Sequence, residues 1–448
     1  MYDLIVIGAG PGGYEAAAHA GRMGKKVALV EKKYIGGTCL NVGCIPAKTY
    51  LKSSKLFSDC QHGASLGVRV ASAEFDLGAL VERKNKIVGT LTRGVENLLK
   101  RSGVEVINGH GRLESRTAVR VGDQSYPARN ILIATGSKPA VPPIPGLDSE
   151  GVLDSASIFE LAQVPGRLAI IGGGYNGLEF ASFFAAVGTE VTVLEMLPQI
   201  AAGCDRDIST RLQQELKKSG VEFKISSKVG SIENRTVHYQ DAEGAKASLT
   251  ADCVLNATGR VPVLEDIGLE QAGVDFDRKG IRTSDQGRTN VPGIWACGDV
   301  TGRRLLAHAA TREGIVAVHN MFGHADRIRY EAIPSIIYTH PEVSSVGRTE
   351  DELKSQGIEY KKSMVPMAIA GRFLIENPLA SGFIKVLTGA RYGEILGVHA
   401  IGDQSSEFIV AAAVMIETEM RVSDVAEIVF PHPTVSEALK EAILSAAV

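Results

Sequence analysis

The chain has 448 residues, enough for about three domains at roughly 150 residues each. Lys and Arg number 48 and Asp and Glu number 51, so the formal net charge of −3 lacks the basic surplus of a nucleic-acid-binding or membrane-surface protein. Six cysteines in a chain of this length exclude a small disulfide-stapled scaffold. The question is therefore whether any two of the six form a working pair.

No segment reads as a targeting or membrane-spanning sequence. Met1–Asp3 has no basic region, and the apolar run Leu4–Ile7 is too short for a signal peptide. The longer apolar stretch Phe408–Ile416 falls far below the ~18–20 residues of a span. We therefore expect a cytoplasmic protein, in a reducing compartment where a close cysteine pair is more often catalytic or metal-binding than structural.

Residues 4–31 are predicted to form a strand, a glycine turn, a helix and a second strand. The turn carries the pattern G-x-G-x-x-G at Gly8, Gly10 and Gly13. In this pattern the first glycine makes the tight turn, the second lets the backbone approach a pyrophosphate, and the third allows close helix–strand packing. Glu31 ends the second strand, where an acid accepts hydrogen bonds from a ribose hydroxyl. The segment therefore predicts a dinucleotide site.

Residues 168–195 repeat this plan. The second turn carries the same pattern at Gly172, Gly174 and Gly177. Glu195 follows the first glycine of its motif by the same interval as Glu31, since 195 − 172 and 31 − 8 both equal 23. A carboxylate at Glu195 would repel a 2′-phosphate and no arginine follows closely, so NAD is favoured over NADP.

A second internal sequence repeat supports two nucleotide-binding domains. Residues 131–136 (ILIATG) match residues 254–259 (VLNATG), and both read as an apolar strand that ends in a small turn. Each segment alone is more often a plain strand end. The pairing adds three candidate cofactor-binding residues, Thr135, Gly136 and Gly259.

Domain boundaries are predicted from a proline-rich segment and from a change in the pattern of predicted strands and helices. Four prolines within residues 138–145 mark the clearest linker. Past about residue 326, strand-like segments alternate with two helices, expected at about 405–419 and 434–446, which indicates an α+β domain. The predicted fold is α/β, with two Rossmann-like domains and a C-terminal α+β domain. The expected divisions are 1–140, 141–263, 264–326 and 327–448.

Cys39 and Cys44 are the only closely spaced cysteines in the chain. A disulfide needs Cα atoms roughly 4.4–6.8 Å apart. A regular helix or an extended strand would hold this pair too far apart, so a bridge needs a distorted turn, which Gly43 can supply. Pro46 suits the first turn of a helix, and Lys48 lies one turn beyond Cys44, so both the helix dipole and a positive charge would favour a thiolate.

Spacing alone leaves other possibilities for this pair. Cys-x4-Cys could be half of a metal site, but Cys60, Cys204, Cys253 and Cys297 are scattered singly, so zinc is disfavoured and we expect no metal. Two buried, unconnected cysteines remain the simple alternative. The flanking glycines and Pro46-x-Lys48, just after a dinucleotide unit, favour a redox pair.

At these residues the sequence resembles the FAD-dependent pyridine nucleotide–disulfide oxidoreductases, and the resemblance runs nearly end to end. Its marks are GGTCLNVGCIP (36–46), GLE (177–179), VPGIWACGD (291–299), LAH (306–308), YTHPE (338–342) and HPTVSE (432–437). Within the family, the chain is most similar to members that oxidise protein-bound dihydrolipoamide with NAD.

The resemblance implies cofactor roles for matching positions. The first glycine unit with Glu31 would hold the ADP half of FAD, in a domain completed by residues 264–326. Asp299 would bind the ribityl or pyrophosphate part of FAD. The backbone near Ala307 and His308 would face the flavin ring. The second glycine unit with Glu195 would hold NAD.

The resemblance also implies catalytic roles. Cys39 would exchange with the substrate and Cys44 would face the flavin, while Lys48 and Glu179 would pair beside it. In a separate segment, His432 would be the acid–base group and Glu437 would orient it. Neutral imidazole takes a proton near its ordinary pKa, and a carboxylate on the other ring nitrogen fixes the tautomer.

In this family the histidine reaches the active site of the other subunit, so a homodimer is implied. The implied partner is a lipoylated acyltransferase or a glycine-cleavage carrier protein. Two other readings stay open, a reductase of glutathione or another small disulfide, and a non-catalytic flavin-binding assembly protein. The chain departs from the family pattern at Asn176, beside the expected nicotinamide pocket, and at Phe430, where some relatives have a further histidine.

Overall fold

The computed structural model describes residues 1–377 and 381–446. The chain forms two compact units. The first unit comprises residues 1–47, 81–140 and 259–328, and the second comprises residues 48–80, 141–258 and 329–448. The division into four domains stays a prediction.

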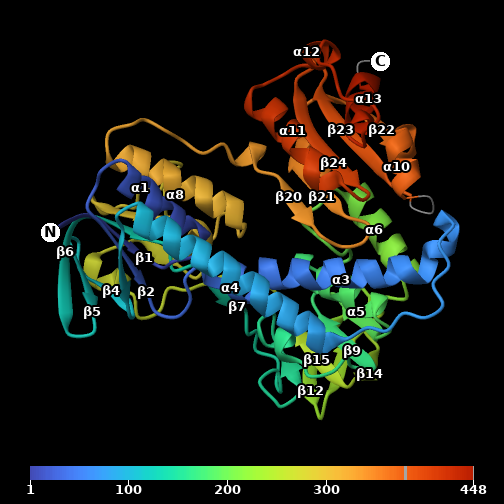
Figure 1. The fold of residues 1–448 in the computed structure, drawn as a ribbon, viewed down its shortest axis with the longest axis horizontal. Helices are drawn as coiled ribbons and strands as arrows, with labels where there is room; N and C mark the ends of the chain where they lie inside the picture. The colour runs from blue at the N-terminus through green and yellow to red at the C-terminus, as the bar shows by residue number, and fades with distance from the viewer. Residues whose placement is uncertain (378–380, 447–448) are drawn as a thin grey trace. The chain divides into compact units, whose positions relative to one another are not determined.

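The first unit contains a seven-stranded sheet (Figure 1), whose strands are β1 (Tyr2–Ile7), β2 (Val27–Glu31), β3 (Glu105–Asn108), β4 (Gly111–Ser115), β5 (Ala118–Val121), β6 (Gln124–Ile133) and β19 (Ile294–Ala296). Its parallel part runs β3–β2–β1–β6, with β19 also paired to β6, and β5 and β4 continue it antiparallel. The strand order departs from β1 in both directions, so the carboxyl end of β1 is the switch point at which such sheets bind ligands.

Two helices pack closely on this sheet. Figure 1 shows α1 (Pro11–Arg22) beside α8 (Ala307–Met321). A Cβ atom on Gly12 would lie 2.9 Å from the carbonyl oxygen of Ala310, and one on Gly314 would lie 2.5 Å from that of Gly12. The two helices can therefore pack this closely only because both positions lack a side chain.

The first unit also contains part of a long helix and several short elements. The long helix α4 (Leu77–Arg101) runs into it from the second unit, as their boundary lies between residues 80 and 81. The remaining short elements are β7 (Ser137–Pro139), β16 (Arg260–Pro262), α7 (Leu269–Ala272), β17 (Phe276–Asp277), β18 (Gly280–Ile281) and the 3-10 turn η3 (Gly298–Thr301).

The second unit contains a second parallel sheet, in the order β11–β10–β9–β15–β8. The strands and helices of this part are β8 (Val152–Leu153), β9 (Arg167–Ile171), α5 (Tyr175–Ala186), β10 (Glu190–Leu194), α6 (Arg206–Lys218), β11 (Glu222–Lys224) and β15 (Cys253–Asn256). An antiparallel sheet of β12 (Lys228–Glu233), β13 (Thr236–Gln240) and β14 (Lys246–Thr250) is an addition that the sequence analysis did not predict.

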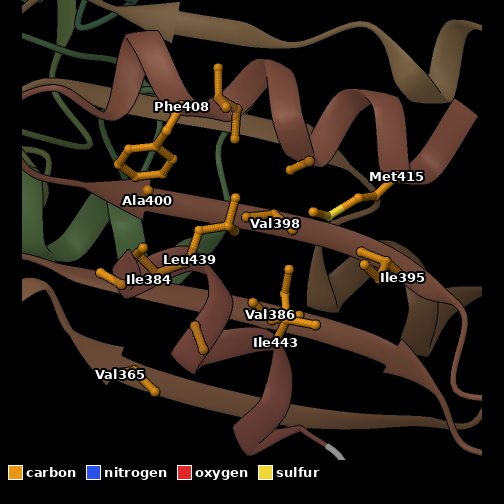
Figure 2. Packing of buried hydrophobic residues seen from close by; sticks show 14 of the residues in the cluster. Val365, Ile384, Val386, Ile395, Val398, Ala400, Phe408, Met415, Leu439 and Ile443 are labelled. Carbon is orange, nitrogen blue, oxygen red and sulfur yellow. The ribbon is translucent and has the colours of Figure 1, made fainter. Parts of the chain in front are cut away.

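The C-terminal part of the second unit is an antiparallel sheet in the order β20–β21–β24–β23–β22. Its elements are β20 (Ser335–Ile337), β21 (Val343–Gly347), α9 (Glu350–Ser355), β22 (Tyr360–Pro366), α10 (Gly371–Glu376), β23 (Phe383–Gly389), β24 (Ile395–Ile401), α11 (Ser405–Glu417), α12 (Val422–Ala426) and α13 (Glu437–Ser445). The helices α11 and α13 contribute to one apolar core with the sheet, and Figure 2 shows Phe408 of α11 over Ala400 of β24 and Met415 of α11 pointing towards Val398.

The predicted fold class is confirmed, because both Rossmann-like sheets and a C-terminal α+β part are present. The repeated strand–turn–helix–strand units lie within a residue or two of their expected bounds. Among the described residues, no helix combines the length and apolar character that a membrane span requires.

Candidate active site and nucleotide-binding loops

The first glycine loop follows β1 and is fixed by close contacts at Gly8 and Gly13 that leave no room for a side chain. Gly8 has a φ of +106°, and a Cβ atom there would lie 2.3 Å from the carbonyl oxygen of Ala134. A Cβ atom on Gly13 would lie 1.9 Å from the Gly8 oxygen, whereas one on Gly10 would meet nothing within 4 Å. The outer two glycines therefore close the turn, and the middle one leaves its backbone open to a ligand.

The second glycine loop, after β9, repeats this geometry. A Cβ atom on Gly172 would lie 2.4 Å from the carbonyl oxygen of Ala257, and one on Gly177 would lie 2.1 Å from the Gly172 oxygen. Gly174 is open, like Gly10. The two loops thus have equivalent shapes as well as equivalent sequences.

The second internal sequence repeat, residues 131–136 and 254–259, is explained by its contacts with the two glycine loops. Ala134 and Ala257 are the residues against which the first glycines of the two loops pack. Among the candidates beside them, the Thr135 hydroxyl donates to the carbonyl oxygen of Val263 at 2.9 Å. Gly136 and Gly259 have φ values of +72° and +126°, which allow the sharp turns that follow the strands.

Glu31 is held by the backbone of the first loop. Its Oε2 accepts a hydrogen bond from the Ala9 N–H at 2.7 Å, and its Oε1 accepts one from the Lys33 N–H at 2.7 Å. In the second loop, Glu195 accepts from the Gly173 N–H at 2.6 Å and from the Leu197 N–H at 2.8 Å. Both carboxylates are therefore oriented at the end of the second strand, where a ribose would be recognised.

Both loops fit the ADP part of a dinucleotide. The loops lead into α1 and α5, and neither helix receives a side-chain cap from the described residues. Neither helix start is therefore covered by a capping side chain, and the positive end of each helix dipole favours a pyrophosphate there. The residues that would hold FAD are those of the first loop, and those of the second loop would hold NAD.

Asp299 lies in η3 of the first unit and is mostly buried. Its Oδ2 accepts a hydrogen bond from the Ser137 hydroxyl at 2.5 Å, and the Arg260 Nε donates to the same hydroxyl at 2.7 Å. Burial raises the pKa of the Asp299 carboxyl, although Ser137 and Arg260 oppose the rise. Sequence reasoning missed Ser137 and Arg260, because they lie far from Asp299 along the chain.

Ala307 and His308 form the first turn of α8. Leu306 precedes them in an extended conformation and provides no side-chain cap. His308 is exposed, while the following alanines are buried against the core. The first turn of α8 is therefore a place where backbone, rather than side chain, could meet a flavin.

The cysteine segment starts in contact with the first glycine loop. The Gly36 N–H donates to the Ala9 carbonyl oxygen at 2.9 Å. A Cβ atom on Gly37, whose φ is +60°, would lie 2.6 Å from the Cα of Gly10. The segment that carries Cys39 is thus fixed beside the proposed FAD loop.

Gly43 separates two helices, α2 (Gly37–Val42) and α3 (Cys44–His62). A Cβ atom on Gly43 would lie 2.9 Å from the Thr38 oxygen and 3.4 Å from the Cα of Cys39, so the chain folds back at this position. Cys44 begins α3, where the helix dipole favours a thiolate. The irregular turn required for a Cys39–Cys44 bridge is present, and the bridge itself stays a prediction.

Lys48 and Glu179 form an ion pair within the second unit. The Lys48 Nζ lies 2.9 Å from each carboxylate oxygen of Glu179, which is only 5% exposed. Glu179 also accepts the Tyr338 N–H at 3.0 Å, and Lys48 lies 4.5 Å from the centre of the Tyr338 ring. Tyr338, which had no assigned role in the sequence, therefore helps to fix this pair.

His432 and Glu437 form the second predicted pair in the second unit. His432 Nδ1 lies 2.9 Å from Glu437 Oε1, and Glu437 Oε2 accepts the Thr434 N–H at 2.9 Å. These contacts lower the pKa of the Glu437 carboxyl, first through Thr434 and then through His432. His432 contacts Glu437 through Nδ1, so its Nε2 faces away from this carboxylate, and the side chain is 80% exposed.

Asn176, the residue that departs from the family pattern, lies on the first turn of α5 and is also exposed.

Three valines near His432 and Glu437 in sequence are exposed. Val429 is 90% exposed, and Val410 and Val414, on α11, are 58% and 53% exposed. Among the described residues, no group of three or more His, Cys, Asp or Glu side chains is arranged to hold a metal ion.

Known proteins resemble this chain over nearly its whole length. A dihydrolipoyl dehydrogenase 3 of Pseudomonas aeruginosa is 44% identical, over 99% of this chain and 97% of its own. A dihydrolipoyl dehydrogenase of Cupriavidus necator is 37% identical, over 99% and 98%. Among solved structures, the HOCl-induced flavoprotein disulfide reductase RclA of Escherichia coli is 28% identical, with a TM-score of 0.87 over 99% of both chains.

Two family profiles also match. Residues 333–443 match the dimerisation domain of the pyridine nucleotide-disulphide oxidoreductases. Residues 2–314 match the main profile of the same family. This chain belongs to the pyridine nucleotide-disulphide oxidoreductase family.

Proposed function

We propose that the chain is an NAD-linked flavoprotein that oxidises protein-bound dihydrolipoamide to lipoamide. The observation that carries the proposal is the contact of the Cys39 segment with the first of two equivalent dinucleotide loops. A dithiol oxidase of this class needs one redox thiol pair beside one dinucleotide and a second dinucleotide site. The full-length similarity to dihydrolipoyl dehydrogenases supports the substrate.

The proposed exchange uses Cys39 and Cys44 as a disulfide. A substrate thiolate attacks Cys39 and breaks the Cys39–Cys44 bond, which releases Cys44 as a thiolate. The second substrate thiol then displaces Cys39, so lipoamide leaves as a disulfide and the two cysteines keep the electron pair. Bound FAD supplies the link that thiols lack, a two-electron transfer between a dithiol and nicotinamide.

His432 and Glu437 manage the protons of this exchange. A neutral His432 with its proton on Nδ1 donates to Glu437 and keeps Nε2 free to accept a proton from the dithiol. The carboxylate stabilises the imidazolium that results. Lys48 places a positive charge four residues after Cys44 on the same helix, where it supports a thiolate.

The proposed assembly is a homodimer, supported by the match to a dimerisation domain. The proposed substrate partner is a lipoylated acyltransferase or a glycine-cleavage carrier protein. The proposed location is the cytoplasm, where a reducing environment keeps Cys60, Cys204, Cys253 and Cys297 as thiols.

The test is steady-state oxidation of dihydrolipoamide with NAD by the FAD-loaded protein. We expect rapid turnover with NAD and much slower turnover with NADP. Negligible turnover, together with fast NADPH-driven reduction of glutathione disulfide, would refute the proposal. A Cys44→Ser variant that keeps full cellular function would instead support a non-catalytic flavin protein. Capture of lipoylated proteins then identifies the partner.

A further inference from the structure

Two histidines that the proposed function does not use meet at the ends of two helices of the first unit. His19 lies in the last turn of α1, and His319 lies in the last turn of α8. Their Nε2 atoms are 2.9 Å apart, although the residues are 300 positions apart in the sequence. One nitrogen can donate a hydrogen bond to the other only if at least one ring is neutral.

A carboxylate orients one of the two rings. His319 Nδ1 lies 2.8 Å from Asp326 Oδ2, and Arg312 donates to both oxygens of Asp326 at 2.7 and 2.6 Å. His319 therefore keeps its proton on Nδ1, and its Nε2 lone pair points towards His19. A carboxylate on the far nitrogen of an imidazole is the usual support of a metal-binding histidine.

The spacing of the two nitrogens matches one metal geometry better than another. With metal–nitrogen bonds of about 2.0–2.1 Å, two ligands at a right angle lie about 2.9 Å apart, whereas two tetrahedral ligands lie about 3.4 Å apart. The right-angle arrangement belongs to square-planar or tetragonal sites, which are typical of Cu(II) and Ni(II). The observed 2.9 Å separation, which is now that of a hydrogen bond, equals the right-angle spacing. To bind Cu(II), the two rings keep this separation and turn until both Nε2 lone pairs point at the ion and no longer along the line between the nitrogens.

The surroundings admit a cation from solvent. The His319 side chain is 30% exposed, and the carbonyl ends of α1 and α8 converge on the pair. Two arginines lie nearby. Arg312 is neutralised by Asp326, whereas Arg22, in the same turn of α1 as His19, is a positive charge that opposes a further cation. His324, whose ring centre is 6.1 Å from that of His319, is exposed and can approach as a third imidazole.

We propose that His19 and His319 form a binding site for one Cu(II) ion, with water completing its coordination. Imidazole is a preferred ligand for this ion, and Cu(II) binds nitrogen sites more tightly than the other divalent first-row metals do. Binding moves the His19 proton from Nε2 to Nδ1 and needs no change in oxidation state.

The probe is Cu(II) alone, added to FAD-loaded protein that carries Cys39→Ser and Cys44→Ser, because thiolates would otherwise bind and reduce the ion. Competition with a chromophoric chelator measures affinity, and electron paramagnetic resonance counts the coordinated nitrogens. We expect one equivalent of Cu(II) to bind at least tenfold more tightly than any further equivalent. Its electron paramagnetic resonance signal should show two or three coordinated nitrogens. Zn(II) should bind at least tenfold more weakly.

Two conservative variants separate a metal site from a hydrogen-bonded histidine pair. His19→Gln and His319→Gln keep a polar contact between α1 and α8, so the fold and its FAD absorbance should persist while the tight equivalent disappears. Asp326→Asn should weaken binding about 10–100-fold. His62→Ala, an exposed helical histidine elsewhere, is the matched control and should change nothing. The proposal is overturned if the tight equivalent survives both glutamine changes, or if the parent protein has none.

Discussion

Glu31 and Glu195 occupy the same position in two copies of one structural unit, and each accepts a backbone N–H of its glycine loop and at least one more from the residues just after it. In both cases the first donor is the residue after the first glycine of the motif, Ala9 or Gly173. The carboxylates are thus preorganised before any nucleotide binds. The first of the two loops adjoins the cysteine segment, which distinguishes its surroundings from those of the second.

Glu195→Gln should reduce the preference for NAD over NADP. The amide keeps an acceptor towards the Gly173 N–H but removes the charge that repels a 2′-phosphate and strengthens the bond to a ribose hydroxyl. We expect kcat/KM for NAD to fall about tenfold, equivalent to the ~1.4 kcal/mol of one such hydrogen bond. Glu31→Gln is the control and should loosen FAD retention without altering the NAD to NADP ratio. An unchanged ratio in Glu195→Gln would contradict the assignment.

Lys48→Met should destabilise the second unit. Glu179 is 5% exposed and would lose its cation while keeping the Tyr338 N–H. Leaving a buried carboxylate partly unsatisfied costs about 1–3 kcal/mol, measured as the free energy of unfolding in urea. Glu179→Gln should cost less, because Lys48 is about a third exposed and can reach water. Equal losses for the two variants would show that burial of Glu179 is not the cause.

His432→Ala should slow thiol–disulfide exchange about 10²–10⁴-fold without weakening FAD retention. Glu437→Gln should have a smaller effect, because the Thr434 N–H can still orient the amide. The pKa of Glu437 is lowered, so its carboxylate persists throughout the neutral range and is lost only under more acidic conditions. The rate of exchange is measured by stopped-flow reduction at a pH where the Glu437 carboxylate is ionised. Equal loss of exchange and FAD would contradict this role.

Lys385→Met should be the most destabilising of these changes. Its side chain, on β23, is 1% exposed and reaches Asp205 at 2.8 Å, Asp207 at 2.7 Å and Glu350 at 2.5 Å. Removal of the cation leaves the buried Asp205 carboxylate beside Glu350 and the partly exposed Asp207, at a cost of about 3–5 kcal/mol in the free energy of unfolding. Lys354→Met, which removes an exposed partner of Glu350, is the control and should leave the denaturation midpoint nearly unchanged.

This network also gives a pH dependence with a definite sign. Burial raises the pKa of the Asp205 and Glu350 carboxyls, but Lys385 and the other hydrogen-bonding and charged partners together more than offset that effect, so the net shift is downward. Their contribution to stability is thus complete above the ordinary carboxyl pKa and is lost as pH falls further. In Lys385→Met the acid limb of the stability profile should flatten, and an unchanged limb would contradict the ion pairs.

Asp299→Asn should change two properties that are measured separately, the pH dependence of folding stability and the rate of FAD release. Burial raises the pKa of Asp299, so the folded FAD-free chain binds more protons there than the unfolded chain, and stability falls as pH rises above the ordinary carboxyl pKa. The asparagine variant should lose that fall, measured by melting of FAD-free protein between about pH 4 and 7. It should also release FAD faster, detected by flavin fluorescence. A variant with the parent's pH dependence would contradict the burial effect.

The parts that sequence predicted are the ones fixed over short distances. A glycine that must turn at +106°, a helix that starts three residues later and an acid 23 positions on all leave marks within one window. The same holds for His432 and Glu437, five positions apart. Gly43 was expected to allow an irregular turn, and α2 and α3 do break there.

The parts that sequence missed depend on pairings across long stretches of chain. Nothing near Lys385 reveals three carboxylates 35 to 180 positions away, and a lysine in an alternating strand reads as a solvent-facing residue. Ser137 and Asp299 meet across 162 positions, and His19 and His319 across 300. The sheet of β12, β13 and β14 was missed because its strands are half exposed and polar.

The placement of His432 has a consequence for synthesis of the protein. A ribosome makes both dinucleotide loops, the two cysteines and Glu179 before it reaches this histidine, and Glu437 follows within five residues. A polypeptide released early could thus bind dinucleotides and present reactive sulfur, yet would lack the proposed proton acceptor. In the proposed mechanism, thiol–disulfide exchange gains its proton acceptor only after residue 432 has been added.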